Sequence, residues 1–409
     1  MNRRITMRLQ AIALCIVMIT GSFPAIAAER IVLGTFSGAA SWTDRWQPQV
    51  QYCSAQTGIE VEYLYIPSGT YSEKILLMAA VGDVPDLLLV PPERVASLVG
   101  AGLVEDLEPW VREKNLDQRY WIPSLIAATQ FHGITIGLPA YVINYTYAYN
   151  EDIFAQHGIT PPAITDWVTW DQVRDIARKA TRDTDGDGTP EIWGFHNGTS
   201  FVQVLAFIRQ AGGAIFTPEG FVQFNTQPVR DGVEYQLGLI NDRLNAPNAS
   251  IFLEGKVASM RFGSGSIVSH LQAKERINLG VASGIMGKVK SDVSYVTPWV
   301  MPAMAKQKDA AWRYMTCMVS REAQAFVSER GVVPMRRDAR ISEDRIEILT
   351  GLIYNLEAAV GYPYHVENEY VQQAFDQAMK QVWAGNASPL TVLESLDRTV
   401  NAYLAEVLK

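Results

Sequence analysis

The stretch IGLPAYVINYTYAYNEDIFAQHGITPP, residues 136–162, decides how this chain is organised. Its segment 141–149 is rich in aromatic and β-branched residues, which favour extended backbone. Apolar and polar residues do not alternate cleanly, and residues 136–150 include no charged side chain. This pattern indicates a strand with both faces buried, or a strand that crosses between two bodies. We expect a hinge strand beside a binding cleft, followed by a short helix that Asn150 caps; an ordinary buried strand is the alternative.

The length of the chain predicts two domains. With 409 residues, the chain exceeds the size at which one hydrophobic core usually stops growing. Hydrophobic residues make up 48% of the chain and charged residues 19%, which is typical of a folded globular protein.

The N-terminus has the features of a secretory signal peptide. Three arginines within the first eight residues precede an apolar run at 11–19, and residues 25–27 provide an Ala-x-Ala cleavage site. We therefore expect residues 1–27 to be removed and the mature protein to lie in the periplasm. A lipid anchor at Cys15 and a membrane-spanning anchor are the alternatives, but the residue before Cys15 is not small and the run is short for a bilayer.

The charge and the cysteines narrow the range of partners and redox states. Removal of residues 1–27, which contain three arginines and no acidic residue, changes the formal net charge from −8 to −11. We therefore expect no nucleic-acid partner and no polybasic segment for a lipid surface. Cys53 and Cys317 remain in the mature chain. An oxidising compartment would allow a disulfide between them, but we expect two buried thiols.

The first third of the chain alternates between strands and helices. Strands are expected at 31–33, 59–65 and 86–90, with helices around Trp46 and at 71–81 between them. This order predicts a parallel sheet with helices on its faces, in which ligands lie beyond the carboxyl ends of the strands. Those ends are Phe36-Ser37-Gly38 and Pro91-Pro92-Glu93-Arg94.

A series of short motifs then carries a family resemblance. They are GIEVE (58–62), GDVPDLL (82–88), AGL (101–103), the stretch 138–154, TWD (169–171), QAGG (210–213), FLEGKVA (252–258), the stretch 310–326 and GVVPMRRDA (331–339). In this ordered set, which spans about residues 31–339, the chain resembles the family 1 extracellular solute-binding proteins. These are the maltose-binding-protein-like, sugar-binding components of ABC importers.

The resemblance implies an α/β, periplasmic-binding-protein-like fold, with two α/β lobes joined by a multi-strand hinge and a ligand cleft between them. With the uncharged crossing stretches near 141–146 and 294–299, it predicts an N-terminal lobe of residues 28–142 and 300–340. Residues 143–299 and 341–409 would form the C-terminal lobe. The implied partners are a mono- or oligosaccharide and the permease subunits of an ABC transporter, and we expect a monomer.

Catalytic signatures are missing from the sequence, which favours a binding protein over an enzyme. The chain has no Gly-x-Ser-x-Gly, His-Glu-x-x-His or phosphate-binding Walker motif, and its five histidines lack metal-ligand spacing. Carboxylate pairs for glycoside hydrolysis are set by spatial rather than sequence distance, so a carbohydrate-active enzyme remains the weaker alternative.

Sugars present apolar CH faces and a rim of hydroxyls, so their sites combine aromatic rings with planar polar groups. Glu93 and Arg94 directly follow the third strand and match positions where the family places an acidic residue and an arginine against the sugar; a surface charged pair is the alternative. Arg336 would favour an anionic ligand if it pointed inward, so a glycerol-3-phosphate-like or other polyol ligand is the nearest alternative. The candidate ligand-binding residues are Phe36, Ser37, Trp42, Glu93, Arg94, Tyr141, Asn144, Ser264, Gly265, Trp299, Arg336, Tyr364 and His365.

One further loop resembles the start of a calcium-binding loop. Asp183, Asp185 and Asp187 alternate around a glycine turn, which suits an oxygen-ligated ion. The twelfth position holds Gly194 instead of a bidentate glutamate, although Glu191 at the ninth could substitute. We expect no cofactor, with a structural calcium ion as the alternative to a plain polar loop.

Overall fold

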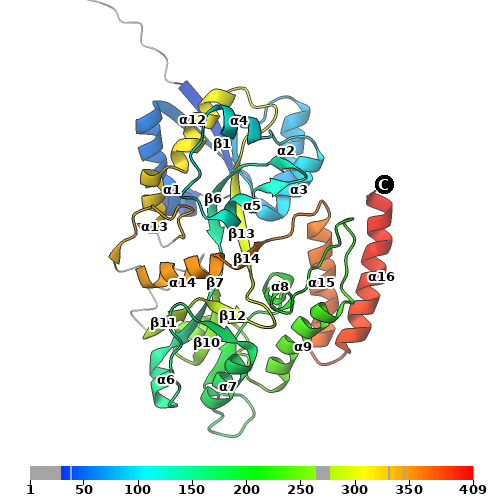
Figure 1. The fold of residues 1–409 in the computed structure, drawn as a ribbon. Helices are drawn as coiled ribbons and strands as arrows, with labels where there is room; N and C mark the ends of the chain where they lie inside the picture. The colour runs from blue at the N-terminus through cyan, green and yellow to red at the C-terminus, as the bar shows by residue number, and fades with distance from the viewer. Residues whose placement is uncertain (1–28, 37–38, 264–276, 330–331, 344–345, 409) are drawn as a thin grey trace, which may run out of the picture.

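The computed structural model describes residues 29–36, 39–263, 277–329, 332–343 and 346–408, and for residues 39–45 and 347 it describes the backbone only. Two α/β lobes lie one above the other and are connected through β-strands (Figure 1). The expected fold class is therefore confirmed.

The first lobe is built on a six-stranded sheet with the order β14-β13-β3-β1-β2, in which β6 also pairs with β13. Strand β1 is parallel to β2 and β3, as the strand–helix–strand pattern predicts, whereas β13 is antiparallel to β3 and β6. Its strands are β1 (Glu29–Thr35), β2 (Ile59–Tyr65), β3 (Leu87–Leu89), β6 (Leu138–Ile143), β13 (Asp292–Val300) and β14 (Ala359–Gly361).

Helices cover this sheet, and α12 packs against both α1 and β1. The helices of this lobe are α1 (Ala39–Thr57), α2 (Tyr71–Ala80), α3 (Pro92–Gly100), α4 (Glu108–Glu113), α5 (Pro123–Ala127), α12 (Lys308–Met318) and α13 (Arg321–Glu329). A 3-10 turn, η1 (Ser68–Thr70), and a two-stranded ribbon, β4 (Gln130–Phe131) with β5 (Ile134–Thr135), complete it.

The second lobe is built on a four-stranded sheet with the order β11-β7-β10-β9, in which β10 is antiparallel to β7 and parallel to β9. Its strands are β7 (Tyr145–Asn150), β9 (Trp193–His196), β10 (Val257–Gly263) and β11 (Leu279–Ala282), and β8 (Trp167–Thr169) pairs separately with β12 (Gly284–Met286). Its helices are α6 (Glu151–Gln156), α7 (Trp170–Ala180), α8 (Phe201–Gln210), α9 (Gln227–Asn241) and α10 (Ser250–Leu253).

Three C-terminal helices complete the fold: α14 (Ile346–Leu356), α15 (Asn368–Trp383) and α16 (Pro389–Val407). Helix α14 contacts β7 and β11 as well as β13 and β14, so it lies where the two sheets meet. Helices α15 and α16 pack on each other and on α9, and Phe375 and Leu393 share one apolar cluster with Phe201 of α8. The C-terminal helices therefore extend the second lobe at its side (Figure 1).

The chain crosses between the lobes inside the stretch that organises the sequence. Strand β6 belongs to the first sheet and ends at Ile143, and β7 belongs to the second sheet and begins at Tyr145. Asn144 between them is fully buried, and its Nδ2 donates to the Leu352 carbonyl of α14 at 2.8 Å. The crossing expected near 141–146 is thus where one sheet ends and the other begins.

Local sequence signals explain several helix starts. The Asn150 side chain accepts from the backbone N–H groups of Asp152 and Ile153, which caps α6 as predicted. Thr169 and Gln172 form a capping box at the start of α7. Each cap satisfies backbone donors that the first turn of a helix leaves without a partner.

The prediction of two buried thiols is wrong. Cys53 of α1 and Cys317 of α12 form a disulfide, with their Cα atoms 5.7 Å apart. The packing of α12 on α1 brings together two cysteines that are 264 residues apart in sequence. Sequence separation alone gave no sign of this contact.

In the described residues, no helix combines the length and the apolar character needed to span a bilayer.

Candidate functional site

A cavity of about 450 Å³ lies between the lobes, where the ends of the first sheet, the crossing strands and α15 meet. From the first lobe, it is lined by residues at the carboxyl ends of β1 and β3, as the parallel-sheet pattern predicts. From the second lobe, α8 and α15 contribute. The lining residues are Phe36, Pro91, Pro92, Glu93, Arg94, Tyr141, Ile143, Tyr145, Val202, Tyr295, Thr297, Tyr362, Glu369, Gln372 and Gln373.

Strand alternation explains which residues of the crossing reach the cavity. Tyr141, Ile143 and Tyr145 are spaced two apart, and side chains at that spacing leave a strand on the same face. On β13, Tyr295 pairs with Ile143 and Thr297 pairs with Tyr141. The two antiparallel strands therefore present a continuous floor of tyrosine, isoleucine and threonine to the cavity.

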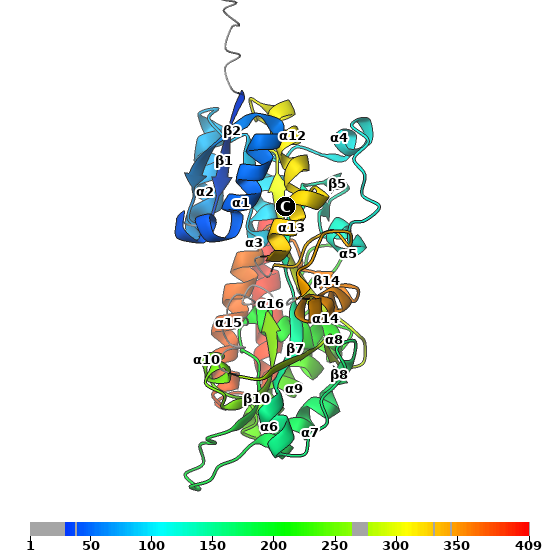
Figure 2. The same cartoon turned by 90° about the vertical axis from the view of Figure 1, so that its left-hand side faces the viewer.

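The charged lining comes from two helices, one in each lobe. Glu93 and Arg94 lie in the first turn of α3, which begins at Pro92 directly after β3. Glu369 lies in the first turn of α15. The Arg94 guanidinium binds both carboxylate oxygens of Glu369, with Nη2 3.1 Å from Oε1. Helix α3 belongs to the first lobe and α15 to the second, and α15 begins close to α3 (Figure 2). The bidentate pair therefore joins the lobes.

Glu93 has different surroundings. Its carboxylate lies close enough to Tyr362 to raise the pKa of that phenol further, after burial, which is the main cause. Among the described residues, no hydrogen bond or ion pair to the Glu93 carboxylate is present, and the Nε–H of Arg94 is buried without a hydrogen-bond partner. The cavity therefore offers the Glu93 carboxylate to a ligand as an acceptor, whereas the Arg94 guanidinium is bound by Glu369.

The aromatic side chains of the cavity are neutral at physiological pH. Burial raises the pKa of Tyr145, Tyr295 and Tyr362 above the ordinary value for a phenol. Two of these hydroxyls are engaged within the protein, since Tyr362 donates to Gln372 at 3.1 Å and Tyr295 lies 3.4 Å from the Val202 carbonyl. The rings, more than the hydroxyls, are thus available for contact with a ligand.

A buried ion pair supports the floor from the second lobe. Arg261 of β10 and Asp292 of β13 have side chains that are each only 1% exposed, and the Arg261 guanidinium stacks 3.5 Å from the centre of the Tyr145 ring. Asn355 of α14 donates to Asp292 at 3.2 Å. Burial lowers the pKa of Arg261, but Asp292 raises it more, so the guanidinium keeps its charge. This network holds Tyr145 in position directly after the crossing.

The comparison with known protein families now decides the class of protein. The family described as bacterial extracellular solute-binding protein matches residues 39–325 of this chain. The chain belongs to this family. Among curated proteins, a Brucella abortus protein whose name says only that it is a binding protein is 22% identical over 371 residues, covering 85% of this chain and 86% of that protein.

Solved structures of several substrate-binding and sugar-binding proteins share the fold. The ABC substrate-binding protein Lmo0181 from Listeria monocytogenes, in complex with cycloalternan, superposes with a TM-score of 0.78 at 17% identity, covering 92% of this chain and 99% of that chain. The sugar-binding protein MalE from Xanthomonas citri gives a TM-score of 0.78 at 17% identity, covering 92% and 98%. The maltose/maltodextrin-binding domain MalE from Bdellovibrio bacteriovorus, bound to maltotriose, superposes with a TM-score of 0.70 at 21% identity, covering 92% of this chain and 100% of that chain.

Four residues predicted from the sequence line the cavity of this solute-binding protein: Phe36, Glu93, Arg94 and Tyr141. Asn144 and Trp299 do not. Asn144 is one residue out of phase with the cavity face of the crossing, and it is bonded to α14 instead. Trp299 is fully buried two residues beyond Thr297, where its ring lies 6.1 Å from that of Trp46 in α1. Both side chains are placed to support the fold.

Other predicted residues lie elsewhere. Tyr364 packs edge-on against Phe131, and His365 stacks on Phe216 at 4.4 Å, both outside the lining of the cavity. Arg336 binds Asp338 and is likewise not a lining residue. Ser37, Ser264 and Gly265 lie outside the described residues, and for Trp42 only the backbone, in α1, is described.

Sequence reasoning missed the contribution of α15. Glu369, Gln372 and Gln373 face the cavity, while Val371 and Phe375 are buried against α8 and α9. An amphipathic pattern identifies that buried stripe, but it does not distinguish a polar face toward a cavity from one toward solvent. Tyr145 and Tyr295 lie in stretches that the sequence did single out, and counting every second residue from Tyr141 would have selected Tyr145.

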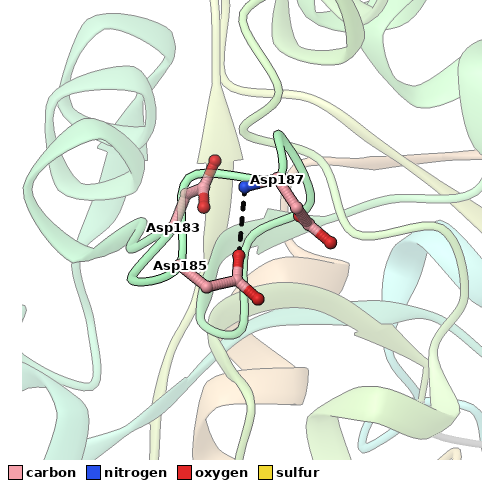
Figure 3. Close-up of side chains that lie close together, drawn as sticks. All are labelled: Asp183, Asp185 and Asp187. Atoms are coloured by element: carbon pink, nitrogen blue, oxygen red, sulfur yellow. Dashed lines mark hydrogen bonds between the residues drawn. The ribbon is translucent and has the colours of Figure 1, made fainter.

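The aspartate loop lies away from this cavity. Carboxylate oxygens of Asp183, Asp185 and Asp187 lie within 4.8 Å of one another (Figure 3). The Glu191 carboxylate instead accepts from the Thr184 backbone at 2.7 Å and is not part of that group. Backbone N–H groups also donate to each aspartate, as in an ordinary polar turn. Calcium binding by this loop stays an untested alternative to the expected plain polar loop.

Proposed function

We propose that this solute-binding protein captures a carbohydrate, either a mono- or an oligosaccharide, in the cavity between its lobes and delivers it to the permease of an ABC transporter. The observation that carries the proposal is the chemistry of the cavity wall. Five aromatic rings, from Phe36, Tyr141, Tyr145, Tyr295 and Tyr362, lie in one cavity with Glu93, Arg94 and Glu369. Ring faces suit the CH faces of a sugar, and carboxylate and guanidinium groups suit its hydroxyls.

The names of related structures support the same class of ligand. Two of the solved proteins with this fold are in complex with carbohydrates, cycloalternan in one and maltotriose in the other. A glycerol-3-phosphate-like ligand is less well supported, because Arg94, the cationic residue in the described lining, is already bound by Glu369. Export through a signal peptide at residues 1–27 would place the protein in the periplasm. There it would act as a monomer and pass its bound ligand to the importer.

Native mass spectrometry of protein purified without refolding tests the proposal. We expect a retained or added carbohydrate to bind with one-to-one stoichiometry, and calorimetry with the identified sugar to give the affinity. Retention of a non-carbohydrate ligand, together with no heat from mono- and oligosaccharides, would overturn the proposal.

A second measurement separates a binding protein from an enzyme. Members of the family are binding proteins, whereas a glycoside hydrolase would use a pair of carboxylates, and Glu93 and Glu369 both line the cavity. We therefore expect a bound oligosaccharide to be recovered unchanged after long incubation with purified protein. Release of shorter products, detected by chromatography, would contradict this expectation.

A further inference from the structure

We propose that Glu369 determines the charge class of the ligand: by occupying Arg94, it makes the cavity accept neutral carbohydrates and exclude phosphorylated or carboxylated ones. This inference rests on the proposed function. Glu369 lies in the first turn of α15 and lines the cavity, but it belongs to no sequence motif.

Three charged residues line the described part of the cavity: Glu93, Arg94 and Glu369. The guanidinium fork that would clamp a phosphate or a carboxylate is already filled, because both terminal nitrogens of Arg94 contact the two oxygens of Glu369. Two of the five N–H donors of Arg94 bind Glu369, and its Nε–H is buried without a partner. The positive charge of Arg94 is thus already balanced by the Glu369 carboxylate and is not free to neutralise an anionic ligand.

The second carboxylate acts in the same direction. Glu93 precedes Arg94 in α3, and no cation among the described residues pairs with it. With Arg94 and Glu369 cancelling each other, the described lining keeps the negative charge of Glu93. The buried Arg261 does not change this balance, because Asp292 neutralises it beneath Tyr145. An anionic ligand would therefore meet net repulsion in a partly dehydrated space.

The position of Glu369 makes this exclusion depend on one side chain. Arg94 is 14% exposed, whereas Glu369 is 48% exposed and reaches Arg94 from the first turn of α15. Removal of the Glu369 charge leaves the aromatic wall in place, frees the fork of Arg94 and brings the formal charge of the described lining from −1 to zero. The selectivity of the cavity would then shift toward anions.

The test compares Glu369→Gln with wild-type protein, by calorimetry at low salt, using inorganic phosphate and the pair glucose and glucose 6-phosphate as probes. We expect the variant to bind phosphate and glucose 6-phosphate about ten- to a hundred-fold more tightly than wild type. This is the gain in affinity expected when the freed Arg94 becomes a charged hydrogen-bonding partner of the anion. Glu369→Ala should give the same gain. The double variant Arg94→Gln/Glu369→Gln should lose it.

Glu394→Gln is the matched control, because Glu394 is exposed on α16, does not line the cavity, and its replacement changes the net charge of the protein equally. A gain in anion affinity with this control, or a gain that survives in the double variant, would overturn the proposal, as would equal anion affinities of wild type and Glu369→Gln. Failure of every neutral carbohydrate to bind wild type would instead refute the proposed function, while the phosphate measurement would still decide the role of Glu369.

Discussion

Two glutamates of the cavity carry the same charge in different surroundings. Glu369 is bound to Arg94, whereas the Glu93 carboxylate has no partner among the described residues and faces the space that a ligand would fill. We expect Glu93→Gln to keep the shape of the site but remove a charged acceptor for ligand hydroxyls. The loss should be about 1.5–3 kcal/mol of binding free energy, or roughly ten- to a hundred-fold in affinity by calorimetry.

Glu73→Gln is the matched control for this change, since Glu73 is exposed on α2 and outside the cavity. The control should bind the ligand as wild type does. Both variants should unfold at the same temperature as wild type, because neither glutamate has a partner within the described protein. An unchanged affinity of Glu93→Gln would place this carboxylate outside the binding site.

Trp299 is predicted to act on stability. Its ring is fully buried and packs on Trp46, so Trp299→Ala should lower the free energy of unfolding by about 3–5 kcal/mol through lost packing. Trp299→Phe should lower it less, because a ring remains and the indole N–H has no hydrogen-bond partner to lose. Urea unfolding measures both. Full stability of Trp299→Ala combined with weak ligand binding would instead identify a sugar-stacking ring.

The contrast between Tyr145 and Trp299 shows which side-chain positions the sequence can predict and which it cannot. Residue chemistry and the ends of predicted strands selected Phe36, Glu93, Arg94 and Tyr141, and all four line one cavity. Whether an aromatic residue of a crossing strand faces a ligand or a helix depends on what covers it, and Trp299 is covered by α1, a helix distant in sequence. No local pattern contains that information.

Among the secondary-structure elements, β13 links the lobes through the ion pair at its start. Arg261 and Asp292 are both buried, so removal of one partner leaves the other charge without compensation. Asp292→Asn should therefore lower the free energy of unfolding by about 3–5 kcal/mol, measured by urea denaturation. The double variant Arg261→Met/Asp292→Leu should recover much of this loss, since buried ion pairs often add little over apolar packing.

The exposed pair Lys256–Glu254 is the comparison for that measurement. Its side chains are 56% and 54% exposed, so Glu254→Gln should change stability by less than about 1 kcal/mol. If Asp292→Asn lowered the free energy of unfolding as little as Glu254→Gln does, water would have to reach and solvate the Arg261 charge. The ion pair beneath Tyr145 would then not be sealed from solvent.

The disulfide between α1 and α12 is a second link between distant elements. Reduction of Cys53–Cys317, or replacement of both residues by alanine, should cost roughly 2–5 kcal/mol of stability, because the cross-link restricts the unfolded chain. Urea unfolding with and without dithiothreitol gives the difference. The alanine variant should not respond to the reductant, and a wild-type protein that also fails to respond would contain free thiols.

The elements themselves were largely predictable, because local signals specify them. The first three strands, the caps of α6 and α7, and the crossing after β6 follow from β-branched residues, capping side chains and an uncharged aromatic run. The disulfide and the approach of α15 to α3 were not predictable, since they join residues 264 and 275 positions apart. Such contacts are products of tertiary packing, which the sequence pattern of either partner does not encode.

For the molecule as a whole, the crossing at Asn144 and the strand β13 leave the lobes connected by few segments beside the cavity. The Arg94–Glu369 pair also joins the lobes, but Glu369 is half exposed, and such pairs are worth about 0–1 kcal/mol. Shifting a two-state equilibrium from mostly open to mostly closed takes about 5.5 kcal/mol. The ion pair alone is therefore too weak to produce such a shift, and we expect a ligand bound by both lobes to stabilise a closed form.

We accordingly expect small-angle scattering to give a larger radius of gyration for ligand-free protein than for protein saturated with its carbohydrate. Arg94→Gln should leave the ligand-free value almost unchanged, because it removes only the weak pair. Glu93→Gln should need about ten- to a hundred-fold more ligand to reach the compact value, in proportion to its lost affinity. Identical scattering with and without ligand would show that the lobes are held together independently of binding, and the hinge at Asn144 would then be a fixed connection.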